Sequence, residues 1–412
     1  MSESEQYQFF VGVDWGSETH VVCVLDPDRQ LIAERSVPHT GIGLTALADE
    51  LTALAPAEPG RIAVAIEVPR GAVVYTLLER GMQVFSLNPK QLDRFRDRHT
   101  VAGAKDDRRD AFVLADSLRT DRPAFRRVQP DHPRVVELRE LSRVEDDLGE
   151  DLRRLSNRLR EQLHRFFPQA LTLCGAADEP WFWALVERVP TPAHAQRLPV
   201  KSVAAVLKVY RVRRFTVESI REALQTLAVH VAPGTVEAAS AHIALLLPRL
   251  RLVQEQCTSV ARRIEALLEE LGQEAVPGEH RDVTILRSFP GVGRVVAATV
   301  LAEAAQPLAE RDYQTLRTHG GIAPVTRKSG KKLSVSMRYG CNPRLRNAFY
   351  HWARTSVQND PHCRDHYGRL RSQGHGHARA LRGVADRSLG VLVAMLTSRT
   401  LYDSERRRNI TT

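Results

Sequence analysis

Charged residues crowd into the stretch AKDDRRDAFVLAD, which covers residues 104–116. Asp106, Asp107 and Asp110 lie there beside Lys105 and Arg108, in a chain whose formal net charge is +10. Residues three or four apart share a face of a helix, so Asp110 can pair with either Asp106 or Asp107. Such a pair is either a solvated helix face or part of a cation site, and the spacing alone does not choose between them.

Two further acids follow predicted strands. Asp14 closes the apolar run YQFFVGVD, and Glu67 closes RIAVAIE. The carboxyl ends of parallel strands meet at one sheet edge, where carboxylates from these strands and the helix would repel one another without a divalent cation. Oxygen-rich sites of this type suit Mg²⁺ or Mn²⁺, and two such ions can clamp a phosphodiester during displacement. We expect Asp93 and Asp116 to be solvated helix residues.

Residues 1–125 have the pattern of an α/β domain. The runs HVVCVLD and QLIAERSV stand at hairpin spacing, with Asp26-Pro27-Asp28 as the turn. Helices are expected around residues 43–54, around 73–80 and from the acidic stretch to about 119, with the strand MQVFSLN before the last. Three meandering strands followed by alternating helix and strand predict a ribonuclease-H-like, or RuvC-like, domain.

Residues 126–280 are expected to be helical. In the later part, apolar residues alternate at spacings of four and three, as in the seam of a coiled coil. The members of this seam are Leu246, Leu250, Val253, Cys257, Val260, Ile264, Leu267 and Leu271. Ordinary amphipathic helices that pack on their own domain are the alternative. Between the two long helical patterns, Trp181, Phe182 and Trp183 are interpreted as core rather than as a base-stacking platform.

Residues 281–405 are expected to form a mostly α-helical C-terminal domain. The run LRSFPGVGRVVAATVLAEA places Gly291 and Gly293 in a turn between two helices. This helix-hairpin-helix pattern can hold a phosphate oxygen on backbone N–H groups. A histidine-rich segment follows, but its spacing lacks the paired pattern of structural zinc sites. Its members are His362, Cys363, His366, His375 and His377.

The composition indicates a polyanionic partner. The 412 residues suffice for two or three domains, and 59 Lys and Arg outnumber 49 Asp and Glu, which favours nucleic acid. The five cysteines are scattered without paired spacing, so we expect a reduced, cytoplasmic protein. No apolar run approaches the length of a membrane span, so no membrane partner is expected.

The motifs GVDWGSETH, IEVPRG, GAKDDRRDAFVLAD, FPGVGRVVAATVLAE and GGIAPVTRKSG resemble those of the DEDD transposases of insertion-sequence family 110. The resemblance spans nearly the whole chain. It implies a RuvC-like N-terminal domain, a coiled-coil middle and a C-terminal transposase domain with a serine nucleophile. The four metal-binding, catalytic acids of the family fall on Asp14, Glu67, Asp107 and Asp110. Asp106 stands where the family usually has Ser or Thr, and is expected to cap the helix.

The same resemblance places the nucleophile at Ser329, which precedes a glycine in GIAPVTRKSGKK. A serine hydroxyl needs an activating partner, and no His or Glu is adjacent. The metal site, of the same or of another subunit, is therefore the natural candidate. Neighbouring cations would attract a phosphate. The expected nucleic-acid-binding residues are Lys105, Arg108, Arg327, Lys328, Lys331, Lys332, Arg338, Arg344, Gly291 and Gly293.

The family resemblance further implies a covalent phosphoserine link to DNA and a structured guide RNA. Joining two DNA sites needs several active sites, so a homo-oligomer is expected, as a dimer or as a tetramer at the synapse. Two alternatives remain open. The chain could be a metal-dependent nuclease or junction resolvase in which Ser329 is structural, or a non-catalytic nucleic-acid-binding protein.

Overall fold

A computed structural model of the chain describes residues 7–87, 89–99, 106–273, 280–330 and 332–405. The chain divides into two compact units, residues 1–131 and residues 132–412. The first unit ends close to the expected domain boundary at residue 125. The second contains both the expected helical middle and the expected C-terminal domain.

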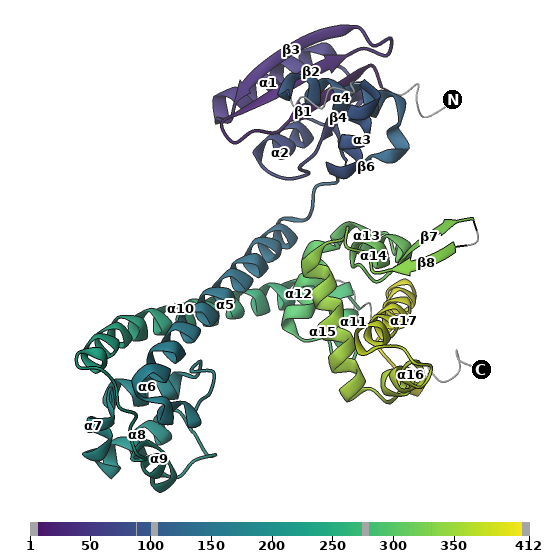
Figure 1. The fold of residues 1–412 in the computed structure, drawn as a ribbon. Coiled ribbons are helices and arrows are strands. Elements are labelled where there is room, and N and C mark those ends of the chain that lie inside the picture. Colours follow the sequence, from purple (N-terminus) through teal and green to yellow (C-terminus); the bar gives the residue numbers. More distant parts are fainter. Residues whose placement is uncertain (1–6, 88, 100–105, 274–279, 331, 406–412) are drawn as a thin grey trace. The chain divides into compact units, whose positions relative to one another are not determined.

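The first unit is a mixed α/β domain built on one sheet, coloured purple to blue in Figure 1. The strand order is β3-β2-β1-β4-β5-β6; β1, β4 and β5 run parallel, and the remaining neighbours pair antiparallel. The strands are β1 (Phe9–Asp14), β2 (Thr19–Leu25), β3 (Leu31–Pro38), β4 (Ile62–Ile66), β5 (Gln83–Ser86) and β6 (Arg126–Arg127). The helices are α1 (Gly41–Leu54), α2 (Ala72–Glu79), α3 (Pro89–His99) and α4 (Asp107–Thr120). The expected hairpin and the three expected helices are confirmed, whereas α3 as a separate helix and the short β6 were not expected.

The two faces of this sheet have different side chains. On one face, large aliphatic residues such as Val13 and Ile66 pack against α1 and α2. On the other, small residues such as Ala63 and Ala65 of β4 lie in the core formed with α4. Because side chains alternate along a strand, this second face also receives Gly12 and then Asp14 of β1.

Gly12 allows α4 to approach the sheet very closely. A Cβ built at this position would lie 1.9 Å from the carbonyl oxygen of Ala111 and 2.7 Å from the backbone nitrogen of Ala115. Both alanines are fully buried. The backbones of β1 and α4 are therefore in direct contact, which fixes the depth at which the start of α4 meets the end of β1.

The second unit is organised on two long helices, α5 (Pro133–Phe166) and α10 (Thr235–Gly272), which pack against each other within one chain (Figure 1). Leu138 of α5 clusters with Ile264 and Leu267 of α10. Leu163 clusters with Leu246 at the other end, so the helices are antiparallel. The leucine seam expected for a coiled coil is thus filled by a helix of the same chain, and it gives no support to a dimer.

Between these helices the chain forms a small helical insert. Its helices are α6 (Pro180–Arg188), α7 (Pro192–Gln196), α8 (Val200–Val209) and α9 (Val217–Leu224). Trp181, Phe182 and Trp183 are at most 4% exposed and belong to the hydrophobic core of this insert. Their interpretation as core residues is confirmed.

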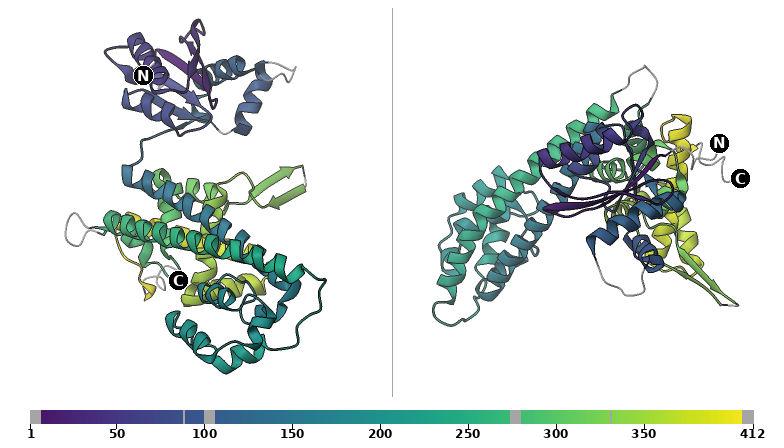
Figure 2. Two further views of the ribbon diagram at one scale, coloured as in Figure 1. Left: turned by 90° about the vertical axis from the view of Figure 1, so that its left-hand side faces the viewer. Right: turned by 90° about the horizontal axis from the view of Figure 1, so that it is seen from above.

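The remaining elements pack around the other ends of α5 and α10, where they share a second hydrophobic core. They are α11 (Asp282–Ser288), α12 (Arg294–Glu303), α13 (Ala305–Ala309), α14 (Tyr313–His319), β7 (Val325–Ser329), β8 (Lys332–Ser336), α15 (Pro343–Asn359), α16 (Pro361–Ser372) and α17 (His377–Ser398). The β7–β8 hairpin projects from these helices in both Figure 1 and Figure 2. Among the described residues, no helix is long and apolar enough to cross a membrane.

We predict that Gly12→Ala destabilises the first unit by about 1–3 kcal/mol, because the added methyl group overpacks a backbone contact. Gly41→Ala is the matched control, since a Cβ at Gly41 meets nothing within 4 Å. Thermal unfolding of the two variants measures the difference. Equal melting temperatures for Gly12→Ala and the parent chain would contradict the close approach.

Candidate functional site

The strand register places Asp14 and Glu67 side by side. Val13 is the partner of Ile66 in the parallel pair of β1 and β4, so the next residue of each strand stands at the same carboxyl edge. Both acids fall on the face covered by α4, because they follow Gly12 and Ala65 by two residues. Each side chain is half-buried. The sheet therefore supplies two neighbouring carboxylates beside the start of α4.

Helix α4 contributes the other two acids from its first turn. Asp106 caps the helix, and its side chain accepts a hydrogen bond of 3.2 Å from the backbone N–H of Arg108. The expected capping role is confirmed. Asp107 is exposed, whereas the side chain of Asp110 is only 1% exposed. A carboxylate buried to that extent needs a cationic partner.

Arg96 of α3 is that partner. Its Nε and Nη2 atoms donate to the two carboxylate oxygens of Asp110, at 2.6 and 2.7 Å. Its Nη1 atom donates to Asp93 at 2.6 Å. The hydrogen bond to Asp110 is the main reason that the pKa of the Arg96 guanidinium is raised, and the charge of Glu67 raises it further. A positive charge thus already stands among the acids of this edge.

The donor set of this edge fits a hard divalent cation, because all its ligands are carboxylate oxygens and a cation is already required there. The acids are not drawn into a tight ligand shell, however. In the described part of the chain, the only group of three ligand atoms within 4.8 Å of one another comes from Cys174, Asp178 and Glu179. Arg96 occupies both oxygens of Asp110, so a metal ion at Asp110 would have to displace this guanidinium.

Asp116 is not a solvated helix residue as expected. Its side chain is 8% exposed, and Arg119 and Arg29 form ion pairs with it at 2.8 and 3.4 Å. Asp116 lies one turn beyond Phe112 on the side of α4 that faces the sheet. A carboxylate buried there is stable only with a cationic partner. Asp93 does remain 67% exposed.

Arg96 and His20 were missed by the sequence analysis. His20 is the second residue of β2 and is fully buried. Its Nδ1 atom accepts a hydrogen bond of 3.3 Å from the backbone N–H of Gly16, in the loop after Asp14. Its Nε2 lies 2.8 Å from Nδ1 of His39. Burial, and next the nearby His39, lower the pKa of His20. A lone histidine in an apolar strand was the available signal, whereas Arg96 is one of several arginines in a charged helix.

Ser329 is the last residue of β7 and is exposed, with Arg327 and Lys328 on the same strand also exposed. Its partner across the hairpin is Lys332. Gly330, which follows it, has a φ of 55°, a left-handed conformation that suits glycine at a tight turn. The hydroxyl therefore stands at the end of a projecting, basic hairpin. Lys105 and Lys331 lie outside the described residues, as does the side chain of Lys332.

Three other expected nucleic-acid contacts have partners within the protein. Arg108 is 73% exposed and forms an ion pair with Glu34. Arg338 donates to the carbonyl oxygen of Ala323 at 3.2 Å, which ties the two sides of the hairpin root. Arg344 forms an ion pair with Glu303 at 3.2 Å.

Glu303 anchors this last network. Burial alone would raise its pKa, but hydrogen bonds from Arg143 and Asn342 outweigh that effect, and the pKa of Glu303 lies below its ordinary value. The charge of Arg344 lowers the pKa of Glu303 further, and Arg344 also forms a hydrogen bond with Asp146. The guanidinium of Arg344 is thus paired with carboxylates of the protein itself.

The turn expected to hold a phosphate lies between α11 and α12. Gly291 faces α15: it has a φ of 91°, and a Cβ there would lie 2.7 Å from the backbone nitrogen of Ser356. The Ser356 hydroxyl donates to the carbonyl oxygen of Pro290 at 2.6 Å. Gly293, in contrast, is exposed at the start of α12. Of the two glycines, Gly293 presents more of its backbone to solvent.

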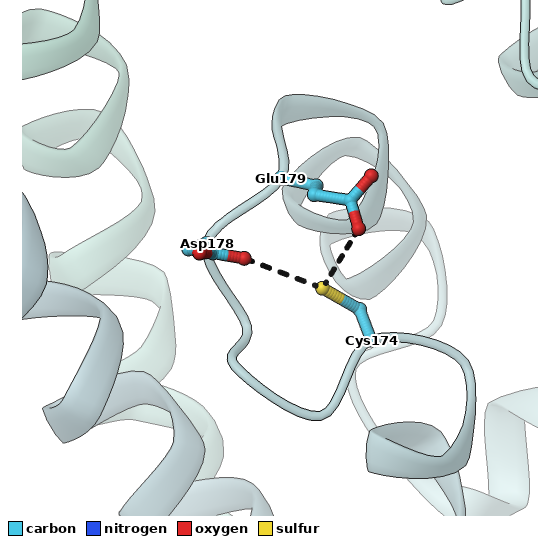
Figure 3. Close-up of side chains that lie close together, drawn as sticks. All are labelled: Cys174, Asp178 and Glu179. Atoms are coloured by element: carbon cyan, nitrogen blue, oxygen red, sulfur yellow. Dashed lines mark hydrogen bonds between the residues drawn. The ribbon is translucent and has the colours of Figure 1, made fainter. Parts of the chain in front are cut away.

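The group formed by Cys174, Asp178 and Glu179 has a structural explanation (Figure 3). The two carboxylates point at the Cys174 thiol, at 3.8 and 3.6 Å. Both oxygens of Glu179 are already engaged, one by Arg214 and the other by the indole N–H of Trp181. Burial raises the pKa of the Cys174 thiol, which disfavours the thiolate that a metal needs.

The histidine-rich segment also forms no cluster among the described residues. His362 lies 3.0 Å from the carbonyl oxygen of Ser404, and His377 lies 2.8 Å from the hydroxyl of Tyr367. Cys363 is buried beside Ser388. Each side chain has a separate neighbour, so the segment does not resemble a zinc site.

Comparison with known proteins points to DNA-processing enzymes. A family model described as a transposase, of the DEDD type of IS110, matches residues 11–168. A second, described as the transposase IS116/IS110/IS902 family, matches residues 283–368. These ranges contain the acids of the sheet edge and the hairpin with Ser329, respectively.

Individual relatives give the same result. The chain is 32% identical to the mini-circle protein for IS117 of Streptomyces coelicolor, whose name describes it as a transposase, over 96% of both chains. It is 29% identical to the insertion element IS110 protein of the same species, over 98% of both. A protein of Sinorhizobium fredii, also described as a transposase, is 49% identical over 52% of this chain and 59% of its own length. The chain therefore belongs to the IS110/IS116 family of transposases.

We predict that Arg96→Met lowers the free energy of unfolding of the first unit by about 3–5 kcal/mol, because it leaves the Asp110 carboxylate buried without a partner. The matched control is Arg80→Met, which removes an exposed ion pair with Asp49 and should change this free energy by less than about 1 kcal/mol. Hydrogen exchange of β1 and β4 in the metal-free chain reports the stability of this unit. The double variant Arg96→Met/Asp110→Asn should recover part of the loss, and a double variant no more stable than Arg96→Met would contradict the pairing.

Proposed function

We propose that this transposase cuts and rejoins DNA strands by covalent catalysis, with Ser329 as the nucleophile. The observation that carries the proposal is the exposed hydroxyl at the end of a basic hairpin, in the part of the chain that matches a transposase family model. Arg327 and Lys328 are exposed beside it, and their charge favours the approach of a phosphodiester. An RNase H-like first unit, with the acids at its sheet edge, is part of the same proposal.

The proposed step exchanges one phosphate ester for another. The Oγ atom of Ser329 forms a bond to phosphorus while the bond from phosphorus to a strand oxygen breaks. The serine proton leaves, and the released strand oxygen takes up a proton. The covalent phosphoserine keeps the energy of the phosphodiester, so the reverse attack by a strand hydroxyl can join DNA without another energy source. The hairpin sequence from Val325 to Ser336 contains no acid and no histidine, so the proton acceptor belongs to another segment.

We assign Asp14, Glu67, Asp107 and Asp110 as the residues that would hold Mg²⁺ or Mn²⁺. When bound, such an ion supplies electrostatic stabilisation of the charge that develops on phosphate oxygens. The carboxylates of Asp14 and Glu67 would hold the ion at the sheet edge, and Arg96 would control access to Asp110 through its two hydrogen bonds. The donor chemistry supports this assignment.

Guide RNA and self-association complete the proposal. A structured RNA would supply sequence recognition, in agreement with the net charge of +10. A homo-oligomer, as a dimer or as a tetramer at the synapse, would hold two DNA sites together. Because α5 fills the leucine seam of α10, the oligomer would use other surfaces.

We predict that Ser329→Ala abolishes a covalent protein–DNA adduct. The chain is incubated with Mg²⁺ and DNA that carries the ends of the element, denatured in detergent and resolved by electrophoresis. The parent chain should yield a species that contains both protein and DNA. Ser334→Ala is the matched control, since Ser334 is exposed on the same hairpin opposite Arg327, and it should retain the adduct.

The same experiment distinguishes covalent catalysis by a serine from metal-dependent hydrolysis. A Ser329→Ala variant that still cuts DNA at the parent rate would identify a metal-dependent hydrolase, and covalent catalysis by Ser329 would be rejected. Loss of the adduct in both serine variants would show that the hairpin acts only through its fold.

We predict that Asp14→Asn removes Mg²⁺ binding to the first unit. A ligand at a free concentration of 100 times its Kd stabilises a folded protein by about 2.7 kcal/mol, and this increment should disappear in the variant. Thermal unfolding with and without Mg²⁺ measures it, independently of any cleavage assay. Asp49→Asn, on the exposed part of α1, is the control and should keep the increment; equal increments in the two variants would remove Asp14 from the metal site.

A further inference from the structure

A cavity of about 330 Å³, here called the hairpin-root pocket, opens where the β7–β8 hairpin leaves the helices. Its lining comes from four segments: the end of α14 and the turn before β7, the chain after β8, helix α15 and helix α17. All four belong to the second unit. Its volume lies at the lower end of the range for small-molecule sites, about 300–1,000 Å³.

Two glycines close the inner wall of this pocket. A Cβ at Gly320 would lie 2.2 Å from the ring of Phe349, and a Cβ at Gly321 would lie 2.7 Å from the sulfur of Cys341. Gly321 also has a φ of 64°. The chain therefore turns tightly against α15 and leaves an apolar floor that includes Ile322 and Leu381, each at most 6% exposed.

Two arginines of the pocket have no anionic partner in the part of the chain that the structure describes. Arg346 of α15 and Arg382 of α17 are half-buried, and their guanidiniums donate to sulfur atoms: Arg346 to Cys341 at 3.9 Å and Arg382 to Met337 at 3.5 Å. Sulfur is a weak acceptor. Among the described residues, neither guanidinium forms an ion pair with a carboxylate.

Two other arginines of the second unit do have carboxylate partners, unlike Arg346 and Arg382. Arg317 binds Asp386 with two hydrogen bonds, and Arg311 binds Asp282 in the same way. These two half-buried guanidiniums are paired with carboxylates, whereas those of Arg346 and Arg382 are not. Two unpaired guanidiniums in one cavity indicate a site for an anion, because a desolvated cation is costly without a counter-charge.

The rim of the pocket adds aromatic rings and an amide. Tyr339 is 78% exposed and Tyr350 is 38% exposed. Large exposed rings beside unpaired arginines suit a flat, aromatic ligand that also carries negative charge. The exposed amide of Asn347 can donate and accept hydrogen bonds at a base edge. A nucleotide has all three features: a phosphate, a stacking face and a polar edge.

We propose that the hairpin-root pocket binds one unstacked nucleotide of the DNA strand that Ser329 attacks, an assignment that rests on the proposed function. Arg346 and Arg382 bind its phosphate, and Tyr339 stacks on its base. The four residue steps from Val325 to Ser329 span about 13 Å, or about four nucleotides at 3.4 Å each, so one strand can reach both sites. Holding a base out of the stack opens the helix near the cleavage point and sets the register of the cut.

Binding of short oligomers tests this without any cleavage. The full chain and its Ser329→Ala variant are titrated with a fluorescent thymidine DNA oligomer, the same oligomer lacking its bases, and a uridine RNA oligomer. We expect Tyr339→Ala to weaken binding of the base-bearing DNA by about 5- to 150-fold and to leave binding of the abasic DNA unchanged. Tyr339→Phe should retain the affinity, since it keeps the ring.

The arginine variants test the anion half of the site. Arg346→Gln and Arg382→Gln should weaken binding of both DNA oligomers, whereas Arg354→Gln, at an exposed position of the same helix α15, should not. Equal effects of Arg354→Gln and Arg346→Gln, or a loss in Tyr339→Ala that is the same with abasic DNA, would overturn the proposal. So would a Tyr339-dependent preference for the RNA oligomer. The titration involves no cleavage, whereas the adduct assay with Ser329→Ala tests covalent catalysis, so failure of the covalent mechanism and failure of the pocket are distinguishable.

Discussion

The first unit depends on one backbone contact, between Gly12 of β1 and α4. Only a residue without a side chain permits the carbonyl oxygen of Ala111 to lie where a Cβ would otherwise be. The surrounding small residues on β4 and α4 extend this close approach along the helix. As a result the first turn of α4 lies at the carboxyl edge of the sheet, where Asp14 ends β1 and Glu67 follows β4. The position of the candidate metal site is thus set by packing rather than by attraction among its ligands.

Those ligands repel one another, and the protein offsets that repulsion with an arginine. Arg96 donates to both oxygens of the buried Asp110, and the charge of Glu67 also raises the pKa of its guanidinium. This arrangement lets the unit fold without a metal ion, because no buried carboxylate is left alone. A divalent cation held by Asp110, as proposed above, would compete with this guanidinium for the carboxylate.

Local patterns were sufficient for much of the fold and for part of the site. Alternation and turn residues predicted the strands around Asp14 and Glu67, and Asp106 was correctly expected to cap α4. The same reasoning failed for Asp116, because its burial and its pairing with Arg29 depend on contacts distant in sequence. The heptad seam of α10 was recognised, yet its partner is α5 of the same chain, which spacing cannot reveal. Arg96 carried no local signal at all.

The net positive charge does not by itself show which cations are free to bind a nucleic acid. Most of the arginines expected or found near the two sites are tied to carboxylates, as Arg344 is to Glu303 and Arg317 to Asp386. Formal charge therefore overstates the surface that is free to attract a nucleic acid. In the second unit, the hairpin with Ser329 carries the exposed cations Arg327 and Lys328, and at its root Arg346 and Arg382 have no carboxylate partner among the described residues. These cations, rather than the total charge, support the path proposed for a DNA strand from the hairpin to its root.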